Sequence, residues 1–225
     1  MQQVKPARRS NRDRTEATRN ALIAAARRLF AEKSYAETGT PEIVAAAGVT
    51  RGALYHHFAD KQALFAAVVE AEAEAVAKEV DRASADTASL RDALIIGGEA
   101  FLEAMAAPGR TRLLLLDGPA ALGRAAMDEI DARHGSRTLR EGLAAAMKAG
   151  DLPLLPLDVL TAQLGAMFDR AALAIDAGAD AQGHREVLTA LIDGILRGQP
   201  AARRRQPAPA KPSADDRTGW LFDTE

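Results

Sequence analysis

The sequence contains no cysteine, few aromatic residues and no long apolar run. None of its 225 residues is cysteine and only 4% are aromatic. The absence of cysteine excludes disulfide bonds, a thiolate nucleophile and cysteine-ligated zinc. No segment approaches the roughly 18 consecutive apolar residues of a membrane span, and the basic N-terminus leads into no apolar signal segment. We therefore expect a cytoplasmic protein with no membrane partner.

Apolar residues, in contrast, are abundant and recur at helical spacing. Hydrophobic residues make up 48% of the chain and charged residues 27%. Charged and apolar residues are interspersed at helical rather than alternating spacing, and no segment has the pattern of a strand. The sequence predicts an all-α fold with an ample core. It contains no glycine-rich phosphate loop, and we expect no cofactor.

Positive charge gathers at one end of the chain. The net charge is -2 overall, but residues 1–30 carry about +6 and the remainder about -8. A basic end on an otherwise acidic molecule is typical of a protein that meets nucleic acid at that end. A solvated basic tail is the alternative interpretation.

Cap residues predict three helices near the N-terminus. Asp13, with Glu16 three residues later, forms a capping box for a helix that runs to about residue 33. Thr40 precedes a proline and predicts the N-cap of a short helix that Gly48 ends, after which Thr50 caps another. This is a helix-turn-helix pattern. Its predicted shared core consists of Ile43, Ala47, Val49, Leu54 and Phe58.

Longer helices follow. Asp60 is positioned to cap a helix from residue 61 to about 84. Turn residues then separate six further predicted helices, over residues 90–107, 111–116, 119–134, 138–149, 157–177 and 182–197.

The segment GVTRGALYHHF, residues 48–58, combines two histidines with a tyrosine and an arginine. His56 and His57 project about 100° apart on a helix and cannot converge on one metal ion. No serine lies in a nucleophile context, so we expect no enzyme. A helix N-terminus with an adjacent arginine favours phosphate instead. His56 is the expected DNA-facing histidine, and His57 the alternative.

The run TPEIVAAAGVTRGALYHHFADKQALF, residues 40–65, resembles the DNA-binding signature of TetR-family transcriptional regulators. Two positions depart from the family's pattern: Ser34 stands where glycine is common, and Gly39-Thr40-Pro41 replaces the usual hydroxyl residue followed by an apolar one. The resemblance implies the following DNA-binding residues: Thr50, Arg51, Gly52 and Ala53 toward the groove, Tyr55, His56 and Lys61 toward phosphates, and Thr40 as a weaker phosphate contact.

The resemblance also implies a division of the chain. We assign residues 1–13 to a basic arm, 14–60 to the helix-turn-helix domain, 61–198 to a helical effector-binding and dimerisation domain, and 199–225 to a disordered tail rich in proline and arginine. Residues 157–197 are expected to pair with their symmetry mates in a homodimer. Core helices of a monomer are the alternative.

An apolar or amphipathic small-molecule effector is the expected ligand, because aromatic residues are scarce. The candidate pocket residues, each also interpretable as plain core, are Phe101, Met105, Leu115, Leu116, Met127, Met147, Met167, Phe168 and Arg170. The expected function is a repressor that an effector releases from a pseudo-palindromic DNA operator. A ligand-independent dimeric regulator or architectural protein is the alternative.

Overall fold

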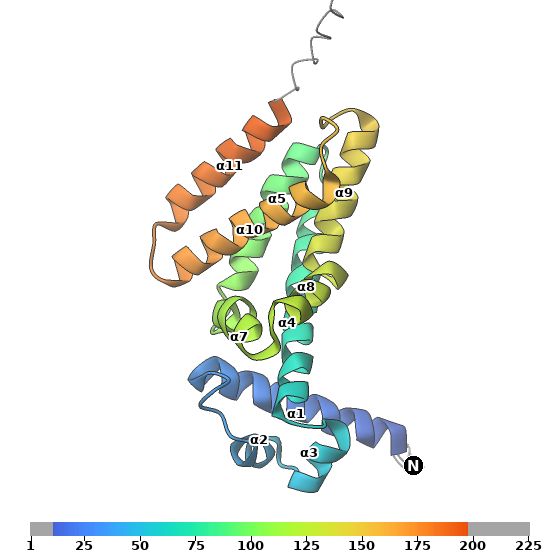
Figure 1. Ribbon diagram of the computed structural model, residues 1–225, viewed down its shortest axis with the longest axis vertical. Coiled ribbons are helices and arrows are strands. Elements are labelled where there is room, and N and C mark those ends of the chain that lie inside the picture. Colours follow the sequence, from blue (N-terminus) through green and yellow to red (C-terminus); the bar gives the residue numbers. More distant parts are fainter. Residues whose placement is uncertain (1–10, 198–225) are drawn as a thin grey trace, which may run out of the picture.

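The structure, a computed structural model, describes residues 11–197 (Figure 1). Within this range every regular element is a helix, which confirms the all-α prediction. The arm residues 1–10 and the tail lie outside the described residues. The elements are α1 (Asn11–Lys33), α2 (Thr40–Ala47), α3 (Arg51–His57), α4 (Lys61–Ser84), α5 (Leu90–Met105), α6 (Arg110–Arg112), η1 (Leu113–Asp117), α7 (Gly118–Leu122), α8 (Arg124–Arg133), α9 (Gly135–Ala149), α10 (Leu157–Asp176) and α11 (Ala181–Arg197).

Helices α1, α2 and α3 form a small module at one end of the elongated molecule (Figure 1). Gly48 ends α2 in the left-handed conformation, with φ of 66°. The Thr50 hydroxyl then caps α3 by accepting a hydrogen bond from the Ala53 N–H at 3.1 Å. The turn between the two helices is therefore built as the sequence predicts.

Two predicted helix starts are wrong. Helix α1 already includes Asn11, so Asp13 lies in its first turn instead of capping it. Gly39 is the N-cap of α2, and Thr40 is its first helical residue, with no side-chain cap. Because Thr40 is not occupied as a cap, its hydroxyl is available to the neighbouring α3.

Helix α4 links the small module to the rest of the chain. Asp60 caps it, since its carboxylate accepts a hydrogen bond from the Ala63 N–H at 2.7 Å. The helix spans 24 residues and runs from the small module up beside α5 (Figure 1). No helix within residues 11–197 is long and apolar enough to cross a membrane.

The middle of the chain is more broken than predicted. The expected helix over 119–134 is two helices, because Gly123, with φ of 84°, interrupts it. The expected helix over 111–116 is a single α-turn followed by the π-helix η1. A π-helix is an uncommon feature that frequently marks a functional site.

A large apolar core extends from the small module through α4 into α10 and α11. It includes the predicted Ile43, Leu54 and Phe58, which are buried, while Ala47 and Val49 pack against it half-buried. A second, smaller core around Leu143 and Leu164 lies between α9 and α10. The chain therefore has one continuous core across the junction of its two parts and a separate one farther away.

Candidate nucleic-acid interface and effector region

Helix α3 is amphipathic across its short length. Leu54 is fully buried and Phe58, which ends the helix, is nearly so. Arg51, Gly52 and Tyr55 are exposed on the other side. The helix thus presents a polar face held in place by two apolar anchors.

Three polar side chains from α2 and α3 meet on this face. The Arg51 guanidinium carbon lies 5.5 Å from the centroid of the Tyr55 ring. Hydrogen bonds with Arg51 and Thr40, together with the positive charge of Arg51, lower the pKa of Tyr55. Tyr55 is 44% exposed despite these contacts, so the cluster can still bind another molecule.

The two histidines differ in their surroundings. His56 is exposed, and His57 is half-buried beside Phe58, with ring centroids 6.4 Å apart. Burial lowers the pKa of His57, and the nearby charges of His56 and Arg19 lower it further. His56 is therefore the more accessible histidine. Within residues 11–197 no three histidine, aspartate or glutamate side chains are grouped to hold a metal ion.

Lys61, which was predicted to contact phosphate, has hydrogen-bond partners within its own chain. Its Nζ donates hydrogen bonds to the carbonyls of Tyr35 at 3.0 Å and Thr38 at 3.2 Å. The same ammonium lies 4.2 Å from the centroid of the Tyr35 ring. Lys61 is half-buried and fastens α4 to the loop between α1 and α2. These bonds use two of the three ammonium N–H donors and help to position the module.

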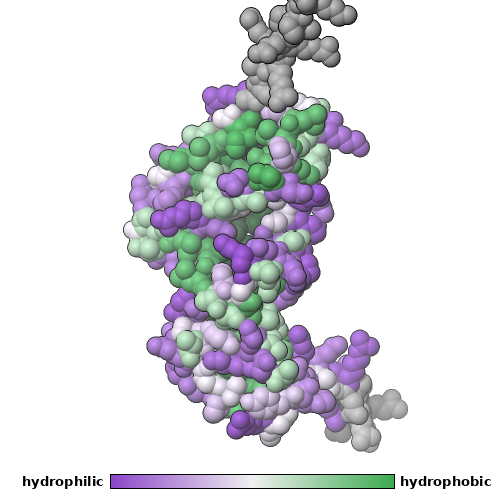
Figure 2. Space-filling view, in the orientation of Figure 1, coloured by the Kyte–Doolittle hydropathy of each residue, from purple (hydrophilic) through white to green (hydrophobic). Residues whose placement is uncertain are grey.

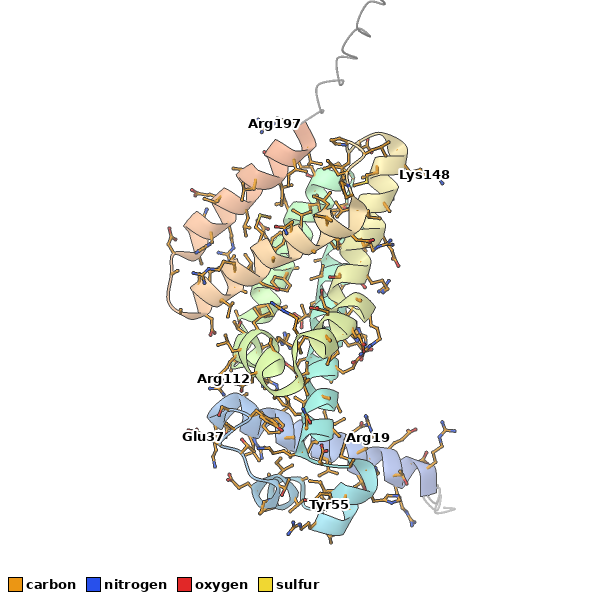
Figure 3. The ribbon with its side chains drawn as sticks, in the orientation of Figure 1. Arg19, Glu37, Tyr55, Arg112, Lys148 and Arg197 are labelled. Carbon is orange, nitrogen blue, oxygen red and sulfur yellow. The ribbon has the colours of Figure 1, made fainter. Side chains whose placement is uncertain are left out.

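Arginines of α1 lie near the same end. Arg12 lies within the predicted basic arm, residues 1–13, but it belongs to α1, as does Arg14. Arg19 lies over the Phe58 ring at 5.3 Å from its centroid, which places its charge beside the end of α3 (Figure 3). Sequence reasoning missed Arg19, although the helical spacing that puts Leu22 inside also puts it near α3.

The junction between the module and the remaining helices is polar and close-packed. Arg112 donates from Nη2 to the carbonyls of Phe30 at 2.6 Å and Ala31 at 2.7 Å. Asp117 accepts a hydrogen bond from the Tyr35 N–H at 3.0 Å. A Cβ at Gly109, where φ is 72°, would lie only 2.8 Å from the Ala31 Cα. The α6–η1 segment therefore contacts the C-terminal end of α1 directly.

Glu72 of α4 joins the same junction. Its Oε2 lies 2.9 Å from Arg110 Nε of α6 and 3.2 Å from Arg27 Nη2 of α1. Burial alone would raise the pKa of Glu72, but the hydrogen bonds and charges of the two arginines bring it below its ordinary value. One carboxylate thus links three helices.

The predicted effector residues are divided between the two cores and the surface. Phe101 and Phe168 lie together, with centroids 6.1 Å apart, and Phe168 packs directly on the backbone of Gly98. Met147 belongs to the second core. Leu116 is 52% exposed and Arg170 is exposed, so neither belongs to the buried residues around Phe168. The remaining predicted residues are Met105, Leu115, Met127 and Met167, which are buried or half-buried within the large core.

A small cavity lies next to Phe168. It has a volume of about 10 Å³, room for at most about one water molecule, and lies between α5, α10 and α11. Asp169, which sequence reasoning missed, is a largely buried carboxyl on α10. Burial, assisted by the negative charge of Asp131, raises the pKa of Asp169 to about 6.

Apolar side chains also lie exposed on α10 and α11. Val159 of α10 and Val187 of α11 are each 59% exposed, and Leu191 is 48% exposed. Leu154, in the loop before α10, is 85% exposed. Apolar surface gathers in the upper part of the molecule in Figure 2.

Comparison with known proteins identifies both parts of the chain. Residues 22–68 match the model described as "Bacterial regulatory proteins, tetR family", and residues 91–199 match the "Tetracyclin repressor-like, C-terminal domain". The chain belongs to the TetR family. The first match confirms that the helix-turn-helix module is the N-terminal part, and the second accounts for most of the remaining helices.

Individual relatives agree with this membership. A helix-turn-helix transcriptional repressor of Mycobacterium tuberculosis is 39% identical over 70 residues, which cover 31% of this chain and 37% of that protein. The first curated relatives are matched over only 29% to 44% of their own length.

Solved structures resemble a larger share of the chain. A TetR-family regulator from Pectobacterium atrosepticum is 29% identical, with a TM-score of 0.67 over 84% of this chain and 99% of that one. The structure of RolR in complex with resorcinol is 20% identical, with a TM-score of 0.66 over 84% of this chain and 92% of that one. The second likeness concerns the fold.

Proposed function

We propose that this TetR-family protein is a sequence-specific DNA-binding repressor, which acts as a homodimer. The observation that carries the proposal is the exposed polar face of α3, held between the buried Leu54 and Phe58. Arg51 at the start of the helix is the proposed base-reading residue, because its planar fork suits a guanine edge. Gly52 and Ala53 leave room for the helix to approach the groove.

Tyr55, His56 and Thr40 are the proposed phosphate contacts, with Thr50 near the groove. Hydroxyl and imidazole groups can donate to phosphate oxygens, and such contacts fix the register of a protein on DNA. Arg19 of α1 joins them by its position beside Phe58. Lys61 is not included, because its ammonium is already bound to two carbonyls.

The exposed apolar residues of α10 and α11 are the proposed dimer surface. Val159, Val187 and Leu191 lie on two adjacent helices that can pair with their symmetry mates as a four-helix bundle. A Leu191→Asp substitution is expected to yield monomers in sedimentation at micromolar concentration. Leu116→Asp, at an exposed apolar residue on η1, is the matched control and is expected to stay dimeric.

We further propose that a small molecule bound beside Phe168, among α5, α10 and α11, releases the DNA. The support is the junction formed by Arg112, Asp117 and Glu72, through which a movement of α6–η1 reaches α1 and α4. A ligand can release DNA only if it binds more tightly to the conformer with mis-spaced recognition helices. RolR, with resorcinol bound, is a ligand-binding protein of similar fold. The ligand-independent regulator remains the second candidate, since the cavity beside Phe168 is small.

Binding of fluorescent DNA fragments tests the DNA-binding proposal. Arg51→Ala should cost about 1 to 3 kcal/mol of discrimination between the preferred site and a site mutated at one base pair. Arg82→Ala, at an exposed arginine on α4 far along the chain from α3, should leave both affinities unchanged. Equal losses of discrimination in both variants would contradict the assignment of Arg51.

A further inference from the structure

A groove on the surface lies between α4 and the α7–α8 segment. Its volume is about 560 Å³, within the range of small-molecule sites. Short side chains form its floor, namely Ala63, Ala66 and Ala67 of α4 and Ala126 of α8. Because these alanines are half-buried and small, the two helices leave a hollow that larger side chains would fill.

Contacts between the helices limit the groove at both ends. At the end near the DNA-binding module, Gln62 Nε2 donates to the Ala121 carbonyl at 2.6 Å. At the other end, Arg133 Nε donates to Glu70 Oε1 at 3.1 Å, and His134 Nε2 lies 2.6 Å from the same oxygen. A groove closed in this way along the helix axes suits a compact molecule better than an extended peptide.

The rim of the groove is acidic. It carries the carboxylates of Asp60, Glu70 and Glu129 and one guanidinium, that of Arg133. Arg133 compensates Glu70 through their ion pair. Asp60 accepts only a backbone hydrogen bond in the described part of the chain, from Ala63. Glu129 has no ion pair within 4.0 Å there, although its charge also acts on Arg133. Two negative charges therefore remain beside an apolar floor.

We propose that this groove binds a small organic cation with an apolar body, such as an aryl-alkyl amine. The ammonium group would lie at the acidic rim beside Glu129, and the apolar body on the alanine floor. The groove is separate from the buried residues around Phe168 that were predicted to bind an effector. Because the rim is acidic, an anionic ligand of the same shape is expected to bind less tightly than the cation.

A ligand bound in the groove is expected to affect the DNA-binding module. Asp60 begins α4 immediately after the proposed recognition helix, so a molecule wedged between α4 and α8 bears on the helix that carries the DNA-binding module. This effect on DNA rests on the proposed function. Binding to the groove does not depend on it.

Three probes with one apolar body and different charges test the inference on the full-length protein. Phenylbutylamine is cationic at pH 7, phenylbutanol neutral and phenylbutyrate anionic. Titration calorimetry without DNA is expected to rank their affinities in that order, with the amine about 2- to 5-fold tighter than the alcohol for each rim carboxylate it meets. Equal affinities, or no saturable binding by the amine at millimolar concentration, would overturn the proposal.

Two variants locate the site. Ala126→Leu fills the floor and is expected to weaken the amine about 10-fold, since it removes most of the apolar contact. Glu129→Gln should lower the preference for amine over alcohol about 2- to 5-fold, whereas Glu103→Gln, at an exposed carboxylate on α5, should leave it unchanged. An unchanged preference in Glu129→Gln would count against the groove even if Ala126→Leu folds poorly. Binding of the same variants to DNA fragments tests the proposed DNA-binding function separately.

Discussion

Replacing Glu72 by glutamine tests the junction that links the DNA-binding module to the other helices. The substitution keeps the shape of the side chain and removes its charge. Only 12% of the Glu72 side chain and 11% of the Arg110 side chain are exposed, against 28% for Arg27. Two arginines would therefore lose their shared partner in a poorly hydrated place.

The expected loss of unfolding free energy is about 2 to 4 kcal/mol at pH 7. Breaking a fully buried ion pair costs about 3 to 5 kcal/mol, and the partial solvent access of Arg27 lowers that figure. Glu74→Gln is the matched control, since Glu74 lies two residues along the same helix. Among residues 11–197 its one ion pair is with the exposed Lys78, one turn away. The control should cost no more than about 0.5 kcal/mol.

The loss should also depend on pH in one direction. Because the pKa of Glu72 is lowered from its ordinary value of 4.5 in the folded state, its stabilisation is complete above that value and is lost as the pH falls through the folded-state pKa. The difference between wild type and Glu72→Gln in urea unfolding should therefore shrink below about pH 4.5. A difference that is below about 0.5 kcal/mol at pH 7, or independent of pH, would refute the reasoning.

Two further substitutions have definite expected outcomes. Burial raises the pKa of Asp169 to about 6, so the folded state favours the protonated carboxyl and loses stability as the pH rises through 6. Asp169→Asn should therefore be more stable than wild type by about 1 to 3 kcal/mol in urea unfolding at pH 7.5. Near pH 4 the two proteins should be equally stable. Lys61→Met should lower unfolding free energy by about 1 to 3 kcal/mol through lost hydrogen bonds, yet leave the salt dependence of DNA affinity unchanged. A salt slope reduced by about one would restore Lys61 to the phosphate contacts.

Cap residues and glycines predicted those helix boundaries that depend on contacts between residues close in the sequence. The left-handed Gly48, the Thr50 cap and the Asp60 cap each involve atoms within three or four residues, and each is found in the structure. Thr40 failed as a cap because Gly39 already has the extended conformation of an N-cap. The break at Gly123 was missed, although a glycine stands there, because apolar spacing continues across it.

Side-chain partners across the fold could not be predicted in the same way. Lys61 has the sequence position of a phosphate contact, but its partners Tyr35 and Thr38 come from a loop more than twenty residues earlier. The pKa of Asp169 depends in part on the charges of Asp131 and Arg124, which lie on α8, far from it in the sequence. Leu116 and Arg170 were predicted to line a pocket because their neighbours in the sequence are apolar. Apolar neighbours alone do not determine which side of a helix or π-turn faces the core.

Selection of bound genomic fragments by the wild-type protein tests the central claim most directly. Two recognition helices related by a two-fold axis should enter successive major grooves, so the selected fragments are predicted to share an inverted repeat with half-site centres about one helical turn, roughly 34 to 36 Å, or a whole number of turns apart. Fragments enriched without any inverted repeat, or enriched equally by Arg51→Ala, would contradict the account.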